Sequence, residues 1–423
     1  MESRSRILML AFACEPDEGS EPEVGWKWAH TMAESCDVTV VTQTKNRSRI
    51  ERWYEDHPSD NLGVKFTYIE LVSILRWLKK RLPGGMYLYY TLWQWKLRSH
   101  CARLLQSGEY DLMHHVTFAS FRMPVFVSGK PVVWGPVGGA EMAPMHLLEG
   151  YGTFAGKLRE KFRNFTTRVA AMMLPLLEPT RRNGGIALAS TPATAELLTG
   201  CGILPKMMPT IGYDFDETAT ITSTGSKINP LRLLFVGRLH LLKGLHLILR
   251  ALAGLQPGQA HLTIVGNGPE YERLLQLTKE LGIDQQVTFA GFVERGKLPD
   301  IFLNHDVVVA PSLYESGGLS VLEGFSHGLP AIVLTCGGHA LSVIEGCGIR
   351  VRPDQDQAAV VSQLMEATQR YSIDRDLVMQ HGANARKHLK EYYAWRSKHD
   401  TMLRIYTDLI GNQIQENHAE SSE

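Results

Sequence analysis

The sequence has no excess of charge of either sign and no long hydrophobic run. Lysine and arginine together number 44, as do aspartate and glutamate, so the formal net charge of the 423 residues is zero. A balanced charge gives no electrostatic reason to expect binding to nucleic acid or to a strongly acidic partner. No apolar stretch approaches the roughly 18 residues that span a bilayer. The sequence therefore predicts a soluble protein without a transmembrane helix.

Cysteine is scarce and scattered. The six cysteines form no C-x-x-C pair and no group with histidine that is typical of a metal site. We therefore expect free thiols, as in proteins of a reducing cytoplasm. Near the amino terminus, Arg4 and Arg6 precede an apolar run from Ile7 to Cys14, but this segment is too short for a secretion signal and lacks a cleavage-like pattern. It predicts a buried first strand.

A dinucleotide fingerprint is also missing. The glycines Gly266 and Gly268 follow an apolar run and precede Pro269, which suits the first turn of a helix. They do not complete the three-glycine fingerprint, and no acidic residue is spaced to bind a nicotinamide ribose. A dehydrogenase is therefore disfavoured.

Apolar runs of strand length alternate with helical patterns along almost the whole chain. This alternation indicates an α/β protein with doubly wound parallel sheets, and the length allows two domains with separate cores. The predicted strands of the first half are Ile7–Ala13, Val38–Val41, Val64–Ile69, Leu112–Val116, Val132–Trp134 and Ile186–Ala189. Those of the second half are Leu231–Val236, Leu262–Val265, Val287–Ala290, Val307–Ala310 and Ala331–Leu334.

The predicted boundaries follow from composition. We assign residues 1–212 to a first Rossmann-like domain, 213–230 to a polar linker, 231–390 to a second Rossmann-like domain and 391–423 to a terminal helix with a frayed tail. Helices are expected from Trp26 to Glu34, after Pro353 and near Asp374–Leu389.

The most informative stretch runs from Pro311 to Gly324. The strand before it enters a Ser316-Gly317-Gly318 turn, and apolar residues at helical spacing follow from Leu319. Two glycines let a ligand approach the backbone, and the free N–H groups of the helix start favour an anion such as phosphate. Glu315 and Glu323 flank this anion site, and their carboxylates can accept hydrogen bonds from hydroxyls. A ligand with a hydroxylated ring on each side of a phosphate bridge is a nucleotide-sugar.

A basic pair follows the first strand of the second half. Arg238 and Lys243 flank the turn between that strand and the next helix. Arginine offers a planar fork of donors and lysine a point charge, so together they can bind one anion.

The Pro311–Gly324 stretch resembles the Glu-x7-Glu motif of the retaining glycosyltransferases of family 4, including the intervening Ser-Gly-Gly-Leu-Ser-Val-Leu. The resemblance implies a GT-B fold, in which two Rossmann-like domains face each other across a cleft. It implies transfer of a hexose from a nucleotide diphosphate sugar to a hydroxyl, with retention of configuration and with neither a metal nor a cofactor.

The resemblance also assigns roles to residues. Arg238 and Lys243 would bind the donor diphosphate and neutralise the leaving group, and Glu315 would hold the sugar hydroxyls. Glu323 would bind the ribose. The remaining donor-binding candidates, which supply backbone groups or close the site, are Gly19, Gly266, Gly268, Phe292, Ser316, Gly317, Gly318 and Leu319.

The first domain carries weaker signals. Gly19 and Gly25 lie in an acidic loop after the first strand, and Gly135-Pro136-Val137-Gly138-Gly139 forms a second glycine-rich turn. Relatives carry a histidine near the reacting sugar. Because side chains alternate along a strand, only one of His114 and His115 is expected to face the cleft, and we predict His115 as catalytic.

Aromatic and basic residues interleave from Leu71 to Arg103, and the basic segment from Phe154 to Arg168 could extend the same face. This pattern suits either a membrane interface with anionic lipid or a basic surface over an aromatic core. We expect a cytoplasmic protein with peripheral contact to the inner face of the plasma membrane, acting in polysaccharide or glycolipid biosynthesis.

A metal site is disfavoured, and two alternative functions stay open. The Asp214-Phe215-Asp216 triplet imitates a metal-binding motif of another fold, but its context in the linker argues against a metal site. The same fold could also belong to a nucleotide-sugar epimerase, or to an inactive relative that only binds a nucleotide-sugar.

Overall fold

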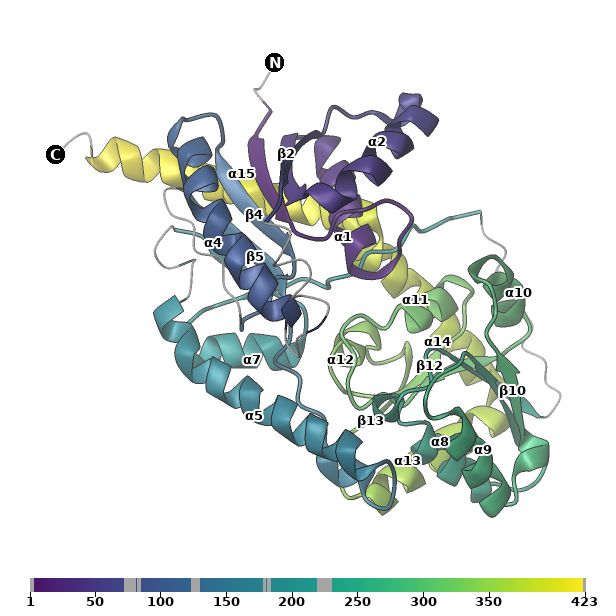
Figure 1. Cartoon of the computed structure of the whole chain (residues 1–423). Helices are drawn as coiled ribbons and strands as arrows, with labels where there is room; N and C mark the ends of the chain where they lie inside the picture. The colour runs from purple at the N-terminus through teal and green to yellow at the C-terminus, as the bar shows by residue number, and fades with distance from the viewer. Residues whose placement is uncertain are drawn as a thin grey trace.

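Two parallel sheets organise the chain (Figure 1). The computed structural model describes residues 4–71, 81, 85–122, 130–177, 180, 184–218 and 230–420. Within these residues, a seven-stranded sheet has the order β3-β2-β1-β4-β5-β6-β7, and a six-stranded sheet has the order β10-β9-β8-β11-β12-β13. In both sheets the chain starts near the centre, builds outward to one edge and then returns to build the other. The predicted doubly wound α/β class is confirmed.

The first sheet contains all six predicted strands and one more. Its strands are β1 (Arg6–Ala11), β2 (Asp37–Gln43), β3 (Lys65–Ile69), β4 (Leu112–Thr117), β5 (Val132–Val137), β6 (Ile186–Ala189) and β7 (Lys206–Met207). Every residue of β4 and β5 is buried, because helices cover both faces of a parallel sheet. The two-residue β7 was missed because so short a strand has no detectable period.

The helices of this half are α1 (Ser20–Ala33), α2 (Arg47–Asp56), α4 (Gly85–Gln106), α5 (Phe154–Leu177) and α7 (Pro192–Gly200), with short turns η1 (Thr44–Asn46), η2 (Pro58–Asp60) and η3 (Met145–Leu148). The prediction that the first helix begins at Trp26 was wrong, since α1 begins at Ser20. Glu21 and Glu23 suit the positive end of the helix dipole, and Pro22 costs little in a first turn, where its N–H would have no partner.

The second sheet matches the predictions closely. Its strands are β8 (Leu231–Val236), β9 (Ala260–Val265), β10 (Val287–Gly291), β11 (Val307–Ala310), β12 (Ala331–Leu334) and β13 (Gly348–Val351). Its helices are α8 (Leu245–Ala253), α9 (Tyr271–Glu280), α10 (Leu298–Leu303), α11 (Leu319–Ser326), α12 (His339–Ser342), α13 (Gln357–Ile373) and α14 (Arg375–His388), with turns η4 (Leu241–Lys243), η5 (Asp284–Gln286) and η6 (Arg295–Lys297). Among these strands, only β13 was not predicted.

The end of the chain packs against the first half. After the π-helical turn η7 (Leu389–Tyr393), α15 (Trp395–Glu420) leaves the second sheet and runs past α1, as Figure 1 shows in yellow. The buried Lys398 donates to the carbonyl of Pro209, and its Nζ lies 5.1 Å from the ring centre of Trp28. Tyr406 forms a 2.6 Å hydrogen bond with Nδ1 of His114 on β4.

The described part of the chain contains no helix that combines the length and the apolar character needed to span a membrane. Of the predicted linker, residues 219–229 lie outside the described residues. The boundaries at 212 and 230 stay predictions.

Candidate active site

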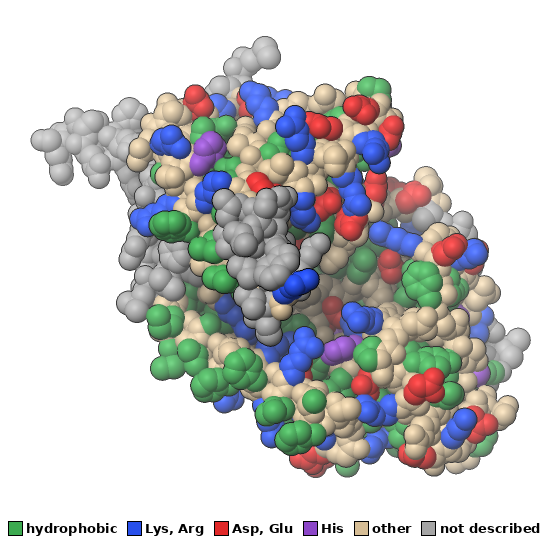
Figure 2. Space-filling model, in the orientation of Figure 1, with side chains coloured by type: hydrophobic (Ala, Val, Ile, Leu, Met, Phe, Trp, Pro, Cys, Tyr) green, Lys and Arg blue, Asp and Glu red, His purple; other side chains and the backbone are tan. Residues whose placement is uncertain are grey.

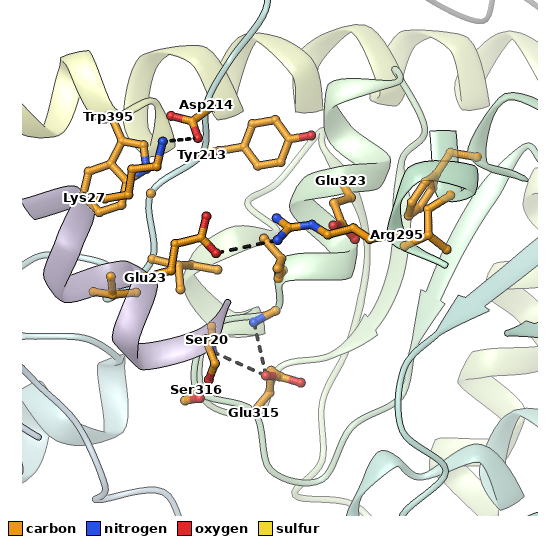
Figure 3. Close-up of a pocket in the computed structure, with 18 of the residues that line it drawn as sticks. Ser20, Glu23, Lys27, Tyr213, Asp214, Arg295, Glu315, Ser316, Glu323 and Trp395 are labelled. Carbon is orange, nitrogen blue, oxygen red and sulfur yellow. Dashed lines mark hydrogen bonds and ion pairs between the residues drawn. The ribbon is translucent and has the colours of Figure 1, made fainter. Parts of the chain in front are cut away.

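A cleft of about 480 Å³ lies where the two halves of the chain meet, and Figure 3 shows its lining. Helix α1 forms one wall, and the turn between β11 and α11 forms the opposite one. The polar residues in its lining are Ser20, Glu23, Lys27, Tyr213, Asp214, Arg295, Glu315, Ser316, Glu323 and His327. The stretch that the sequence singled out therefore borders the main cavity between the halves.

The two glycines of the β11–α11 turn are needed for different reasons. Gly318 has φ of 70°, a left-handed conformation that favours glycine, and an added Cβ would lie 2.8 Å from the ring of His339. At Gly317, an added Cβ would lie 3.0 Å from the side chain of Ile211. The turn is thus packed tightly on one side by the second domain and on the other by the segment that leaves the first sheet.

Glu315 occupies the anion site that the turn creates. Its Oε1 accepts hydrogen bonds from the backbone N–H of Gly317 (3.4 Å) and of Gly318 (3.2 Å), and its Oε2 lies 2.6 Å from Nζ of Lys243. These are the amides that the sequence had assigned to the donor phosphate. The carboxylate of Glu315 is a negatively charged group in the place expected for phosphate oxygens.

The charge of Glu315 is well stabilised. Burial raises its pKa. The charge of His339 when protonated, the ion pair with Lys243 and the hydrogen bond from the Gly318 N–H outweigh burial and bring the pKa of Glu315 to about 2. Burial also lowers the pKa of His339 to about 4, so that this imidazole is neutral at pH 7. Lys243 is therefore the cation that pairs with Glu315.

Backbone packing explains why Lys243 reaches Glu315. Gly244, directly after Lys243, has φ of 65°, and an added Cβ would lie 1.9 Å from the carbonyl oxygen of Pro311. The N–H of Leu313 donates to the carbonyl of Leu242 at 2.8 Å. The two turns thus touch through their main chains, which fixes the distance between the two charges. Arg238 is exposed, and its guanidinium makes no hydrogen bond or ion pair within the described residues.

His339 is a candidate residue of the active site that was not predicted from the sequence. Its side chain is 1 % exposed, and neither ring nitrogen has a hydrogen-bond partner in the described part of the chain. The preceding Gly337 and Gly338 pack against the carbonyl oxygens of Glu315 and Ser316, where any Cβ would clash. A glycine pair followed by histidine at the end of β12 was the signal for this second turn.

The glycines Gly266 and Gly268 serve the packing of neighbouring turns. An added Cβ at Gly266 would lie 2.0 Å from the carbonyl of Gly237, and one at Gly268 would lie 2.2 Å from the carbonyl of Leu239. The next turn carries Phe292, whose side chain is 74 % exposed at the same edge of the sheet. The two glycines thus allow close packing of the strand ends, and none of Gly266, Gly268 and Phe292 lines the 480 Å³ cleft.

Glu323 projects into the cleft from α11. Burial raises its pKa to about 7, an effect that the nearby Arg295 partly opposes. Figure 3 shows the Arg295 guanidinium between Glu323 and Glu23 of α1. A carboxyl with this pKa is partly ionised near neutral pH and can gain charge when hydroxyl donors bind.

The acidic segment after the first strand, expected to be a loop, supplies the start of α1 and lines the cleft, but its ion pairs were not predicted. Glu23 lies 3.6 Å from Arg295 of the second domain, and Lys27 lies 2.7 Å from Asp214 of the connecting segment (Figure 3). These two ion pairs join the halves across the cleft. The acidic loop was the available signal, but the partners are more than 180 residues away in the sequence.

Other acidic residues of this segment, before α1 and in its first turn, have partners in the first half of the chain. Glu15 pairs with Lys45 at 2.9 Å, and Glu18 pairs with Arg49. The carboxylate of Glu21 accepts from the N–H of Phe118. Gly19, with φ of 70°, precedes α1, and Ser20 after it lines the cleft. The acidic cluster is thus mainly occupied by structural partners.

A second cavity of about 400 Å³ continues the cleft on the side of the first sheet. It shares Ser20, Val24, Ile211, Ser316 and Gly317 with the first cavity. The residues that line it from the first half include Tyr87, Tyr90, Arg122, Gly138, Gly139 and Arg163. The predicted glycine-rich turn after β5 therefore faces Ser316 and Gly317 across this space.

The prediction that His115 faces the cleft was wrong. His115 is only 2 % exposed, and its Nε2 lies 2.8 Å from the hydroxyl of Tyr90, which itself lines the second cavity. His114 is fully buried between Tyr406 and the carbonyl of Gly135. Burial lowers the pKa of His115 to about 3 and that of His114 to about 4. Both imidazoles lie behind the wall of the site, because α4 covers His115 on one face of β4 and α15 covers His114 on the other.

The Asp-Phe-Asp triplet does not converge on one point. Asp214 pairs with Lys27, whereas Asp216 accepts hydrogen bonds from the N–H and hydroxyl of Thr218. The two carboxylates therefore have separate partners.

The chain is similar in sequence to known glycosyltransferases, mainly in its second half. Residues 216–388 match the family described as glycosyl transferases group 1. An uncharacterized glycosyltransferase of Methanocaldococcus jannaschii is 32% identical over 190 residues, which are 44% of this chain and 46% of that protein. The D-inositol 3-phosphate glycosyltransferase of Corynebacterium jeikeium is 31% identical over 184 residues, 41% of this chain and 43% of its own. The chain thus spans less than half the length of the curated relatives that it matches.

The similarity in structure extends over almost the whole chain. The crystal structure of HepE from Anabaena in complex with UDP and glucose has a TM-score of 0.58 to this chain, covering 96% of it and 100% of HepE at 18% identity. At this identity the likeness shows the fold alone. It confirms the predicted GT-B arrangement of two Rossmann-like domains.

Proposed function

We propose that the whole chain transfers a hexose from a nucleotide diphosphate sugar to a hydroxyl acceptor, on the premise that residues 216–388 match the group 1 glycosyl transferases. The observation that carries the proposal is the Lys243–Glu315 pair at the Gly317–Gly318 amides, between two connected cavities. One cavity takes the donor and the other takes the acceptor.

The donor diphosphate binds beside the amides that Glu315 now occupies. Phosphate oxygens are better acceptors for Lys243 and for the helix N-terminus than a single carboxylate is, because they carry more charge. When the diphosphate takes over Lys243, Glu315 becomes free to accept hydrogen bonds from the sugar hydroxyls. Arg238, exposed and without a partner among the described residues, adds a second positive charge.

Transfer proceeds with retention of configuration and without a metal in this proposal. The charge that develops on the departing nucleotide is stabilised by Lys243 and Arg238, which are already in place before the reaction. The acceptor hydroxyl attacks the anomeric carbon from the face that the nucleotide leaves. The new bond forms as the bond to the diphosphate oxygen breaks, and the hydroxyl proton passes to the departing diphosphate. His115 does not touch the substrates; it acts as a positioning residue that holds Tyr90 in the wall of the acceptor cavity.

The experiment that tests the donor site compares two glutamate variants. Uridine, guanosine and adenosine diphosphate sugars are screened for thermal stabilisation of the protein and for hydrolysis; uridine nucleotides come first because HepE was solved with UDP. With the best donor, Glu323→Ala should weaken binding about tenfold or more, since the ribose hydroxyls lose a charged acceptor. The exposed Glu272→Ala is the control and should bind normally. Equal affinity in both variants would remove the ribose assignment.

The two alternatives give different products. An epimerase would release an altered nucleotide-sugar without an acceptor, and an inactive relative would be stabilised by the donor without any hydrolysis. A glycosyltransferase of polysaccharide or glycolipid biosynthesis would instead consume donor in proportion to acceptor. Peripheral contact with a membrane belongs to the same proposal.

A further inference from the structure

The outer face of α5 carries an unbroken apolar stripe. Seven large apolar side chains of this helix are between 44 % and 82 % exposed: Phe154, Leu158, Phe162, Phe165, Val169, Met172 and Met173. Most successive members of the series are separated by three or four residues, so they share one side of the helix. A helix of a soluble protein normally turns such a side toward the core. On α5 this side faces outward.

Basic side chains flank the stripe and acidic ones are missing from it. Lys157, Lys161 and Arg168 lie along one border and Arg159 along the other. Glu160 is the single acidic residue of α5, and it is buried against Arg163 at 2.8 Å. Figure 2 shows the green hydrophobic side chains in a row along the place of α5, with blue ones beside them.

The opposite side of α5 already has its partners within the protein. At its start, an added Cβ at Gly156 would lie 3.2 Å from Leu241 of the second domain, and farther along, Asn164 donates to the carbonyl of Ala143. Arg163 stacks on Tyr314 at 3.8 Å, and Leu174 is buried. The helix is therefore held in place, and the stripe is not needed for the core.

We propose that α5 docks on the surface of an anionic lipid bilayer. The apolar stripe enters the boundary between headgroups and acyl chains, and the basic residues remain among the anionic headgroups. Charge selects this occupant. A second copy of the chain, packed through the same stripe, would bring two sets of basic side chains together with no exposed acidic residue of α5 to pair with them.

This placement moves the membrane contact predicted from sequence. The Leu71–Arg103 segment suited either a membrane interface or a basic surface over an aromatic core. Its residues Tyr89, Tyr90 and Trp93 belong to the buried core, Tyr87 and Trp95 are exposed, and Trp77 lies outside the described residues. The segment from Phe154 onward, expected only to extend that face, carries the exposed stripe instead.

Docking through α5 also bears on the acceptor. Arg163, on the inner side of the same helix, lines the second cavity. A bilayer against the outer side would lie one helix diameter away from that cavity. This arrangement favours an acceptor that is linked to a lipid. That consequence rests on the proposed transferase function, whereas the docking itself does not.

The test is sedimentation of the full chain with vesicles of phosphatidylcholine, with and without phosphatidylglycerol. We expect binding to the anionic vesicles only, and weakening as salt rises. The double variant Phe162→Ser, Phe165→Ser should lose binding about tenfold or more, and Lys161→Glu with Arg168→Glu should lose about fivefold per charge removed. Ile373→Ser, an equally exposed apolar residue in the second domain, is the matched control and should bind as the unaltered chain does.

Three results would overturn the proposal. The first is equal binding of the chain to neutral and anionic vesicles. The second is full vesicle binding by the double phenylalanine variant. The third is that the unaltered chain is a dimer and the double variant a monomer, while both bind vesicles equally. Surface substitutions rarely unfold a protein. Unchanged thermal unfolding and unchanged donor hydrolysis in the double variant would separate loss of docking from failure of the transferase proposal.

Discussion

The Nζ of Lys243 lies 2.6 Å from Oε2 of Glu315, although the two residues come from turns that follow different strands of the second sheet. The pair holds a carboxylate on the Gly317 and Gly318 amides, which are the natural position for a phosphate. The site is therefore kept charged and ordered before any donor binds. In the proposed function, donor binding exchanges one anion for another at Lys243.

Replacing Lys243 tests this exchange. In Lys243→Ala the proposed diphosphate site loses a half-buried cation, so we expect turnover to fall about 100-fold or more. Measurement of kcat and of nucleotide affinity by calorimetry checks the loss. Lys297→Ala, an exposed lysine of the same domain, is the control. Turnover within a factor of about two of the unaltered chain would remove Lys243 from the reaction.

Gly318 offers a test of the turn itself. In Gly318→Ala the new Cβ would lie 2.8 Å from the ring of His339, and the backbone at this position has a φ of 70°. The turn must therefore shift, and we expect both the donor affinity and the thermal stability to fall. Gly258→Ala has a similar φ of 82° but open space around it, and it should cost only about 1 kcal/mol. Equal effects of the two variants on donor binding would show that tight packing at Gly318 does not matter.

Glu323 should give the protein a specific pH dependence. Its pKa is raised from 4.5 to about 7, so the folded state binds more protons than the unfolded state between these values. Protonation of Glu323 therefore contributes to the free energy of unfolding. This contribution is fully present below pH 4.5 and is lost as the pH rises through 7, by at most about 3 kcal/mol.

Thermal unfolding of the unaltered chain and of Glu323→Gln is compared from about pH 5 to about pH 8. This range extends about one unit or more on either side of the raised pKa of Glu323. Relative to the variant, the unaltered chain should become less stable as the pH rises. A constant difference across this range would contradict the raised pKa.

The packing of α15 on the segment before the second domain can be tested with two glycines. At Gly212 an added Cβ would lie 2.5 Å from the ring of Trp395, so Gly212→Ala should displace the start of α15 and cost about 1–3 kcal/mol. Gly411, farther along α15, has open space, and Gly411→Ala should stabilise by about 0.5–1 kcal/mol. Opposite signs in urea unfolding are expected. A neutral Gly212→Ala would mean that Trp395 moves freely.

Much of the fold was predictable because its signals are local. The strands β8, β11 and β12 have the predicted bounds, since a strand buried on both faces is a short apolar run between turn residues. The Glu315–Glu323 stretch was recognisable for the same reason: strand, glycine turn and helix start adjoin in the sequence. Where the signal was short or ambiguous, as at β7 and at the start of α1, the prediction failed.

By itself the sequence determined the order of strands and helices, the class of fold and the anion-binding turn. The tertiary structure decided which groups meet there: Lys243 beside Glu315, Arg295 beside Glu23, and His115 behind Tyr90 rather than in the cleft. It also decided that the apolar side of α5 faces outward. Periodicity shows that a helix has an apolar side, but only the packing of distant segments determines whether that side is covered.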